Sequence, residues 1–106
     1  MANVKSERAD GVLTLTIDRE EVRNALNRAT LEEIEAALDA ADADEGVRVV
    51  VLRGAGDRAF CAGADLGEML SHDSIADSRR QFDGLARVIR RMHAMGPPVI
   101  ARVPGY

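Results

Sequence analysis

Small residues and one carboxylate crowd a short stretch of the chain where a ligand could come close to the polypeptide backbone. The stretch RGAGDRAFCAGADL, residues 53–66, contains three glycines and directly follows the apolar run VRVVVL. Glycines placed just after a strand leave the main chain open to close approach by another molecule. Two kinds of chemistry fit this pattern: binding of a dinucleotide's pyrophosphate, and binding of the oxygen of an acyl group while it reacts.

The first half of the stretch, residues 54–59, matches the G-x-G-x-x-G/A pattern of dinucleotide-binding loops. That interpretation requires a helix to begin near Gly56, so that its N-terminus faces the pyrophosphate. Gly63 would then lie inside the helix, where glycine costs about 1 kcal/mol relative to alanine. The acidic residue expected after a second strand is also missing, because Asp73 and Asp77 lie in a polar stretch. The sequence therefore disfavours a dinucleotide-binding domain, which is kept only as a remote alternative.

The second half of the stretch, FCAGADL, favours an oxyanion site. Ala62, Gly63 and Ala64 leave room for a ligand, and Asp65 stands where a helix would begin. A backbone N–H in the first turn of a helix has no intrahelical acceptor and lies at the positive end of the helix dipole. Such an N–H is a ready donor to an oxyanion. The same residues also fit a glycine-permitted turn capped by Asp65, and the residues alone leave both interpretations open.

The elements that must position this stretch follow an α/β pattern. Residues 4–9 and 12–17 flank Asp10-Gly11, which is a favoured hairpin turn. Residues 47–52 are apolar on both faces apart from Arg48, which predicts a buried parallel strand. The run VIARV, residues 99–103, predicts a last strand that is also buried. The order of hairpin, helix, strand, helix and strand is typical of an α/β fold.

Two long helices are expected between these strands. The first is expected to open at Thr30, with Glu33 completing a capping box, and Gly46 is expected to close its region. Its buried stripe is expected to contain Leu31, Ile34, Leu38 and Ala41. A short helix from about Asp65 and a polar segment at residues 71–78 come next. The second long helix is expected to bury one face and to end at Gly96-Pro97-Pro98, the buried residues being Phe82, Leu85, Ile89 and Met92.

Composition argues against several classes of function. Of the 106 residues, 46% are apolar and 30% are charged, so we expect neither a disordered chain nor a membrane protein. The net charge of −4 and the scarcity of aromatic residues disfavour nucleic-acid binding. The charged first ten residues hold no apolar signal-peptide core, and the single cysteine, Cys61, cannot form an internal disulfide. We therefore expect a cytoplasmic protein.

Three segments taken together resemble the enoyl-CoA hydratase/isomerase family, also called the crotonase family. They are GVLTLTIDREEVRNALN, VRVVVLRGAGDRAFCAGADLGEM and PPVIARVPGY, and they follow the family's order and spacing. The most specific motifs are NAL at residues 24–26 and FCAGADL at residues 60–66. The resemblance implies that residues 1–106 are the N-terminal part of a crotonase-like ββα spiral, an α/β fold whose second half is missing from this chain.

The resemblance also implies that the substrate is an acyl-CoA thioester. Two backbone N–H groups hold the thioester oxygen in this family, and the first of them corresponds to Ala64. The main chain around Ala62 is implied to meet the adenine end of CoA, and Asp65 and Leu66 are implied to flank the acyl thioester. Arg23 matches a cation that lies near the CoA phosphates. The expected binding residues are completed by two small residues of the motifs, Ala25 and Gly63.

The remaining parts of such a site are implied to lie elsewhere. The second N–H donor is expected from a loop after PGY, residues 104–106, and the acid–base carboxylates from further on. We therefore expect the parent protein to be an enoyl-CoA hydratase or isomerase of fatty acid metabolism, and the 106-residue chain alone to be inactive. The alternative is a truncated, non-catalytic protein that binds CoA or a partner chain. The resemblance implies no cofactor beyond the CoA thioester substrate, no metal, no nucleic-acid or membrane partner, and a homo-oligomer (trimer or hexamer) at full length.

Other reactive side chains are interpreted as structural. His72 and His93 are expected at the surface or in packing, and Cys61 is expected to pack as a small apolar residue. Glu68 is interpreted as a solvated helix carboxylate. The crowded arginines of the second long helix are expected on its solvent face, and they are Arg79, Arg80, Arg87, Arg90 and Arg91.

Overall fold

The predicted hairpin begins the chain in a computed structural model that describes residues 3–71 and 74–104. Strand β1 (Val4–Ala9) pairs antiparallel with β2 (Val12–Ile17). The φ angles of Asp10 and Gly11 are 53° and 80°, and both lie in the left-handed region that a two-residue type I′ turn requires. Aspartate and glycine tolerate this conformation better than most residues, so these two residues set the register of the hairpin.

Two parallel pairings extend the hairpin into a four-stranded mixed sheet with the order β1-β2-β3-β4. Strand β3 (Val49–Gly54) is parallel to β2, and β4 (Val99–Arg102) is parallel to β3. A parallel neighbour requires a crossover connection, and each crossover here contains a long helix. The predicted α/β class is therefore confirmed.

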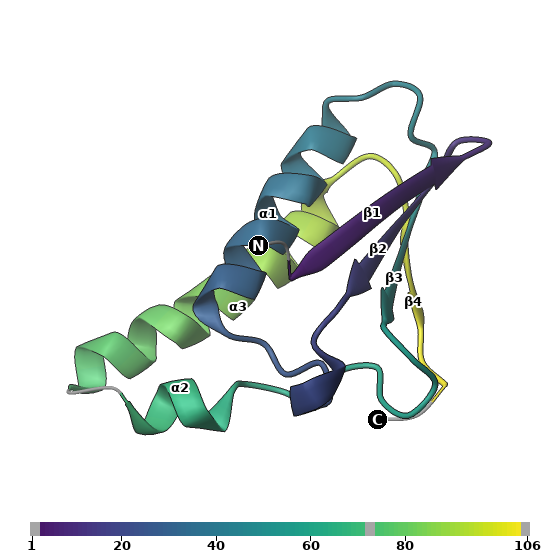
Figure 1. The fold of residues 1–106 in the computed structure, drawn as a ribbon. Helices are drawn as coiled ribbons and strands as arrows, with labels where there is room; N and C mark the ends of the chain where they lie inside the picture. The colour runs from purple at the N-terminus through teal and green to yellow at the C-terminus, as the bar shows by residue number, and fades with distance from the viewer. Residues whose placement is uncertain (1–2, 72–73, 105–106) are drawn as a thin grey trace.

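Both long helices cover the same face of the sheet (Figure 1). Helix α1 (Arg28–Asp42) lies in the crossover from β2 to β3, and α3 (Ile75–Ala94) lies in the crossover from β3 to β4. The core between the two layers is apolar, and its buried residues include Leu15, Ile17, Val50 and Leu52 from the sheet, Leu31, Ile34 and Leu38 from α1, and Val88 from α3. The stripe predicted for α1 is confirmed, because all four of its residues are buried.

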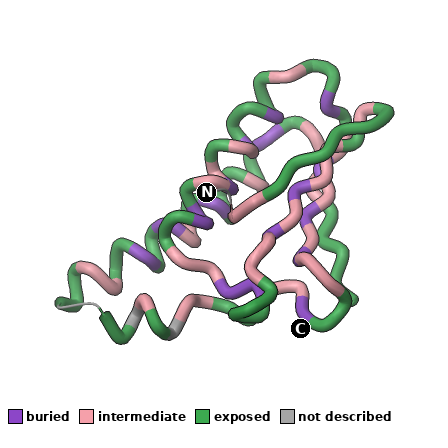
Figure 2. Tube along the Cα trace, in the orientation of Figure 1, coloured by how far each residue is buried: buried purple, intermediate pink, exposed green. Residues whose placement is uncertain are grey.

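Strand β4 is largely exposed, contrary to the buried strand predicted for residues 99–103, and β1 is exposed as well. Strand β4 exposes three of its four residues, and Ile100 and Val103 are among the exposed large apolar side chains. Strand β1 is exposed along nearly its whole length (Figure 2). Both strands lie at the edges of the sheet, and the helices cover only one of its faces, so an apolar run here does not ensure burial.

Helix α1 begins earlier than predicted, and the expected capping box is wrong. Asn27 is the N-cap, and its Oδ1 accepts hydrogen bonds from the backbone N–H and the hydroxyl of Thr30 at 2.8 and 2.5 Å. Glu33 does not reach back to Thr30; its carboxylate accepts from the backbone and side-chain N–H groups of Asn3 instead. Asparagine is at least as good an N-cap as threonine, so Asn27 can cap α1 three residues before Thr30.

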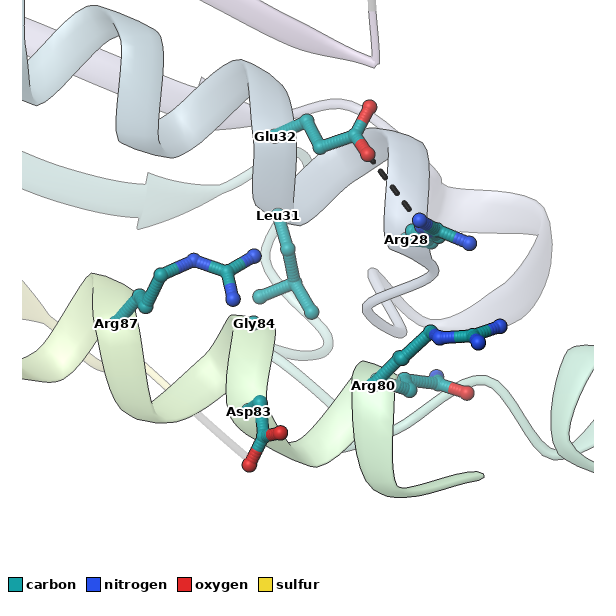
Figure 3. A pocket seen from close by; sticks show the side chains of 8 residues that line it. Arg28, Leu31, Glu32, Arg80, Asp83, Gly84 and Arg87 are labelled. Carbon is teal, nitrogen blue, oxygen red and sulfur yellow. Dashed lines mark ion pairs between the residues drawn. The ribbon is translucent and has the colours of Figure 1, made fainter. Parts of the chain in front are cut away.

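Helix α3 also differs from prediction at its start and on its buried face. Ser74 is its N-cap, so the part of the predicted polar segment from Ile75 onward is helical, while His72 lies outside the described residues. Phe82 and Ile89, predicted to be buried, are 50% and 44% exposed. The buried positions are Gln81, Gly84 and Val88. Gly84 lets Leu31 of α1 lie against α3, as the close-up of the helix pair shows (Figure 3).

Candidate active site

Two segments that are far apart in sequence meet at the C-terminal ends of β2 and β3. Residues 18–27 follow β2 and contain the short helix η1 (Glu20–Val22), whereas residues 55–65 follow β3 and lead into α2 (Leu66–Leu70) (Figure 1). Open α/β sheets bind ligands at the carboxyl ends of their parallel strands. Three backbone hydrogen bonds join the segments: Ala62 N–H to Arg23 O at 3.0 Å, Leu26 N–H to Gly63 O at 2.7 Å, and Asp65 N–H to Leu26 O at 2.9 Å.

This pairing directs the N–H of Ala64 away from the neighbouring segment. The C=O of Gly63 and the N–H of Ala64 belong to one trans peptide group, in which they point in opposite directions. Because the Gly63 oxygen accepts from Leu26, the Ala64 N–H faces the other way. It has no acceptor among residues 3–71 and 74–104. A backbone donor held in this way can bind the oxygen of a ligand.

Gly63 opens the space beside this donor. Its φ of 104° lies in a region that side-chain-bearing residues rarely adopt, so the turn requires glycine. A Cβ placed on Gly63 would meet no atom within 4 Å. The main chain is therefore accessible from that side, as the spacing of small residues predicted.

Asn24 ties the two segments together from inside. Its side chain is buried, with 1% of the residue exposed. The Nδ2 group donates to the backbone oxygens of Ala55 and Ala59 at 3.1 and 3.0 Å, and Oδ1 accepts from the Arg19 N–H at 3.0 Å. Arg23 and Asn24 both have positive φ angles, 55° and 58°, so the chain turns sharply here. The NAL motif pointed to Asn24, but the residues alone assigned it no role.

A second link, partly buried, joins Arg19 to Asp65, and the sequence analysis did not identify Arg19. The Arg19 guanidinium donates to Asp65 Oδ2 at 3.0 Å and to the backbone oxygen of Ala25 at 2.5 Å. The two side chains are only 12% and 15% exposed. The pKa of Asp65 is lowered, first by the hydrogen bond from the Glu68 N–H and next by Arg19. A depressed pKa means that the fold favours the ionised carboxylate.

This lowered pKa predicts acid sensitivity of the loop. A carboxylate with a lower pKa in the folded state adds stability above its unfolded pKa, about 3.9 for aspartate, and that stability is lost as pH falls through the folded pKa. Asp65→Asn should therefore lower the free energy of unfolding at pH 7 and flatten its decline below about pH 4. Urea unfolding at several pH values measures both effects.

Asp44→Asn is the matched comparison for this prediction. The pKa of Asp44 is also lowered, first by its hydrogen bond from Arg8, but the side chains of Arg8 and Asp44 are 45% and 43% exposed to solvent. Solvent screens such a pair, so its removal should change the acid dependence less than Asp65→Asn. An acid dependence that is the same in Asp65→Asn and the unaltered chain would show that the Arg19–Asp65 link adds no pH-dependent stability.

The start of α2 is fixed to the same framework. Asp65 Oδ1 accepts from the Glu68 N–H at 3.0 Å, so Asp65 caps the helix that begins at Leu66, near the predicted position. Glu68 Oε1 accepts from the backbone N–H of Arg28, the first residue of α1, at 2.8 Å. Glu68 is therefore a helix-to-helix link rather than a free surface carboxylate.

Two clefts with different linings adjoin the loop, one at Ala62 and the other at Gly63. The first, which we call the polar cleft for its charged groups, has a volume of ≈ 800 Å³. Its lining includes two carboxylates and two guanidinium groups, from Glu20, Glu21, Arg23 and Arg58, together with Ala62. The second has a volume of ≈ 620 Å³ and a mostly apolar lining that includes Leu26, Phe60, Gly63, Leu85 and Met92. A ligand with one polar and one apolar part could therefore cross the main chain at Gly63.

The structure brings most of the sequence-predicted site residues together. Ala62, Gly63, Ala64 and Asp65 form the loop, and Leu66 begins the helix that follows. Arg23 is exposed and lines the polar cleft. Ala25 differs, because it is buried, its N–H donates to Val22 O, and its C=O accepts from Arg19. Ala25 therefore supports the segment from inside, with 7% of its surface exposed.

Other sequence interpretations have mixed outcomes. A dinucleotide loop would need a helix from about Gly56, but the first helix after β3 begins at Leu66. The predicted solvent face of α3 is confirmed, since its five arginines are exposed. Two of them reach α1, where Arg87 pairs with Glu35 and Arg91 with Asp39. Gly105 and Tyr106 of PGY lie outside the described residues.

Among residues 3–71 and 74–104, no helix combines the length and the apolar character that crossing a membrane requires. Within the same residues, no group of three histidine, cysteine, aspartate or glutamate side chains could hold a metal ion.

Comparison with known proteins gives consistent results. The family model described as enoyl-CoA hydratase/isomerase matches residues 7–106. A short-chain-enoyl-CoA hydratase of Clostridium acetobutylicum is 39% identical over 105 residues, which are 98% of this chain and 40% of that protein. A crotonyl-CoA hydratase of Syntrophomonas wolfei is 37% identical over the same shares.

Solved structures match over the same portion. An enoyl-CoA hydratase from Bacillus anthracis superposes with a TM-score of 0.94 at 32% identity, covering 98% of this chain and 40% of that one. An enoyl-CoA hydratase from Mycobacterium smegmatis gives a TM-score of 0.91 at 38% identity, covering 97% and 40%. The chain thus spans about two fifths of the length of these relatives.

Proposed function

Because this chain belongs to the enoyl-CoA hydratase/isomerase family, we propose that its 62–65 loop binds an acyl-CoA thioester and that the Ala64 N–H donates to the thioester oxygen. The observation that carries the proposal is the Ala64 N–H itself. It is directed away from Leu26, has no acceptor among the described residues, and stands beside the open space at Gly63. Other N–H groups of the loop are engaged, since those of Ala62 and Asp65 bond to residues 23 and 26.

The chemistry explains why a fixed backbone donor is useful. When water adds to an enoyl thioester, the hydroxyl joins the β-carbon and a proton joins the α-carbon. Between these two steps the thioester is an enolate, with negative charge on its oxygen. That charge grows as the reaction proceeds, so a donor fixed in place stabilises the transition state more than the substrate. One such donor contributes about 3 kcal/mol. The Ala64 N–H is held by the Leu26 pairing and needs no reorganisation to act.

The two clefts support an orientation for the substrate. The nucleotide part of CoA is charged and polar, and we place it in the cleft lined by Arg23, Arg58 and Ala62. The Ala62 carbonyl has no donor among the described residues, so it can accept from the adenine amino group. The acyl chain is placed on the apolar side, toward Leu26 and Phe60. The thioester then crosses the main chain at Gly63, next to the Ala64 N–H.

Activity requires more than this loop. Proton transfer needs a titratable group within reach of the substrate, and the family resemblance implies that these groups and the second donor come after residue 106. We therefore propose hydratase or isomerase activity for a protein that contains the whole fold, and thioester binding without turnover for the 106-residue chain. A non-catalytic CoA-binding protein is the alternative.

Binding can be tested on the chain itself. In an NMR titration of the ¹⁵N-labelled chain, crotonyl-CoA should shift the Ala64 amide resonance downfield, because the N–H gains an acceptor. Free CoA should shift the amide resonances of residues in the polar cleft but shift the Ala64 resonance less. NAD should shift neither set of resonances. Perturbations that avoid residues 62–65, or an equal response to NAD, would contradict the proposal. Binding together with no hydration by the complete gene product would favour the non-catalytic alternative.

A further inference from the structure

A buried glutamine on α3 reaches across to the candidate site. Gln81 is 3% exposed, and its Nε2 donates to the backbone oxygen of Leu26 at 3.2 Å. Its Oε1 is closed off from solvent and has no hydrogen-bond partner among the described residues. Gln81 also borders a hollow of ≈ 100 Å³ between α1 and α3 (Figure 3), but Oε1 is not accessible from it.

The orientation of the Gln81 amide is set by its one bond. If oxygen and nitrogen exchanged places, two acceptors would face each other at the Leu26 carbonyl, so Nε2 must be the atom that points there. An unpaired buried acceptor costs about 1 to 3 kcal/mol, comparable to or larger than the net gain from one ordinary hydrogen bond. An apolar side chain of similar size would avoid that cost. Stability alone therefore does not account for a glutamine at this position.

The Leu26 carbonyl is the point through which Gln81 reaches the loop. This oxygen accepts from Gln81 and also from the Asp65 N–H at 2.9 Å. The Leu26 N–H donates to the Gly63 oxygen at 2.7 Å. The backbone of Leu26 is therefore hydrogen-bonded to the residues immediately before and after Ala64. The direction of the Ala64 N–H follows from these two bonds, because each fixes one of the peptide groups that flank Ala64.

We propose that Gln81 is a positioning residue that sets the direction of the Ala64 N–H by holding the Leu26 carbonyl. The inference rests on the proposed function, since it gives Gln81 a task only if Ala64 is an oxyanion donor. Gln81 touches no part of the proposed substrate and acts only through Leu26. Loss of the amide should leave the loop folded but let the donor drift from its direction.

The test is Gln81→Leu in the complete gene product, with Gln81→Met as a second variant of the same unbranched length. We expect kcat to fall about tenfold, less than the 10² to 10³ expected for loss of a whole donor. The dissociation constant for free CoA should stay within threefold, and the melting temperature should stay the same or rise, because an unpaired buried acceptor is removed. The infrared band of the thioester carbonyl in bound crotonyl-CoA should shift less than in the unaltered protein.

The carbonyl band is the deciding measurement, because it reports on polarisation of the thioester whether or not the protein turns over. Gly84→Ala is the control: it lies on the same buried face of α3, and the new Cβ would sit 3.5 Å from Leu31 Cδ1, an ordinary contact. It should raise the melting temperature, since alanine replaces glycine within a helix, and leave kcat and the carbonyl band unchanged.

The outcomes separate this inference from the proposed function. If Gln81→Leu lowers stability and kcat together and leaves the carbonyl band in place, Gln81 is only structural and the inference is wrong. If Ala64→Pro abolishes the band shift but both Gln81 variants keep it, the inference fails and the donor assignment stands. If neither Ala64→Pro nor the Gln81 variants alter the band, the proposed function itself fails.

Discussion

Replacement of Ala64 by proline should lower kcat by about 10² to 10³ in the complete gene product, which is the usual cost of losing one oxyanion donor. Proline has no N–H, so the proposed donor disappears. The substitution breaks no hydrogen bond among the described residues, because the Ala64 N–H has no acceptor there. Gly63 precedes it and has the conformational freedom to accept a following proline.

Binding should change much less than turnover. The donor acts mainly on charge that develops during the reaction, whereas we place CoA mostly in the polar cleft beside Arg23 and Ala62. The test therefore needs kcat, the dissociation constant of a product-like CoA ester, and the melting temperature of the same variant. Together they distinguish loss of a donor from a general loss of structure.

The control for Ala64→Pro is Ile75→Pro, which places proline at the exposed first position of α3, after Ser74 in an extended conformation, where helices tolerate it. Its kcat should remain within threefold of the unaltered protein. If Ala64→Pro also stays within threefold while remaining folded, Ala64 is not an oxyanion donor. If its kcat and melting temperature fall together, residue 64 serves the turn alone.

Features encoded by neighbouring residues could be predicted from the sequence. The Asp10-Gly11 turn and the stripe from Leu31 to Ala41 were confirmed, since each depends on local conformational preference or on a single helical period. The small residues around Gly63 likewise indicated where a ligand could approach. What the loop binds stayed open until the family resemblance was considered.

Features that depend on tertiary partners could not be predicted. The buried face of α3 is displaced from the one expected, because polar Gln81 occupies a buried position while Phe82 beside it is exposed. The Arg19–Asp65 pair joins residues 46 apart, and nothing near Arg19 indicates its partner. The direction of the Ala64 N–H depends on pairing with Leu26, 38 positions earlier in the chain. On α3 the buried residues Gln81, Gly84 and Val88 recur at helical spacing. That spacing would have been the only signal for Gln81, and it is hard to recognise because glutamine and glycine are not apolar side chains.

Asn24 should be the largest single contributor to the stability of this framework, and Asn24→Ala should lower the free energy of unfolding by about 3 to 5 kcal/mol. The substitution leaves the Ala55 and Ala59 oxygens and the Arg19 N–H without their buried partner. Each unpaired buried group costs about 1 to 3 kcal/mol, although water that enters the site offsets part of this. Alanine also tolerates a φ of 58° less well than asparagine.

Two further variants divide this loss into its causes. Asn24→Gly removes the amide but permits the left-handed backbone, so it should be about 1 kcal/mol more stable than Asn24→Ala. Asn27→Ala is the matched control, because it removes an asparagine whose side chain bonds to Thr30 in the first turn of α1, and it should cost about 1 to 2 kcal/mol. Urea unfolding followed by circular dichroism gives all three values. Since a small domain is stable by only about 5 to 15 kcal/mol, an Asn24→Ala chain no less stable than Asn27→Ala would show that the loops hold together without the Asn24 amide.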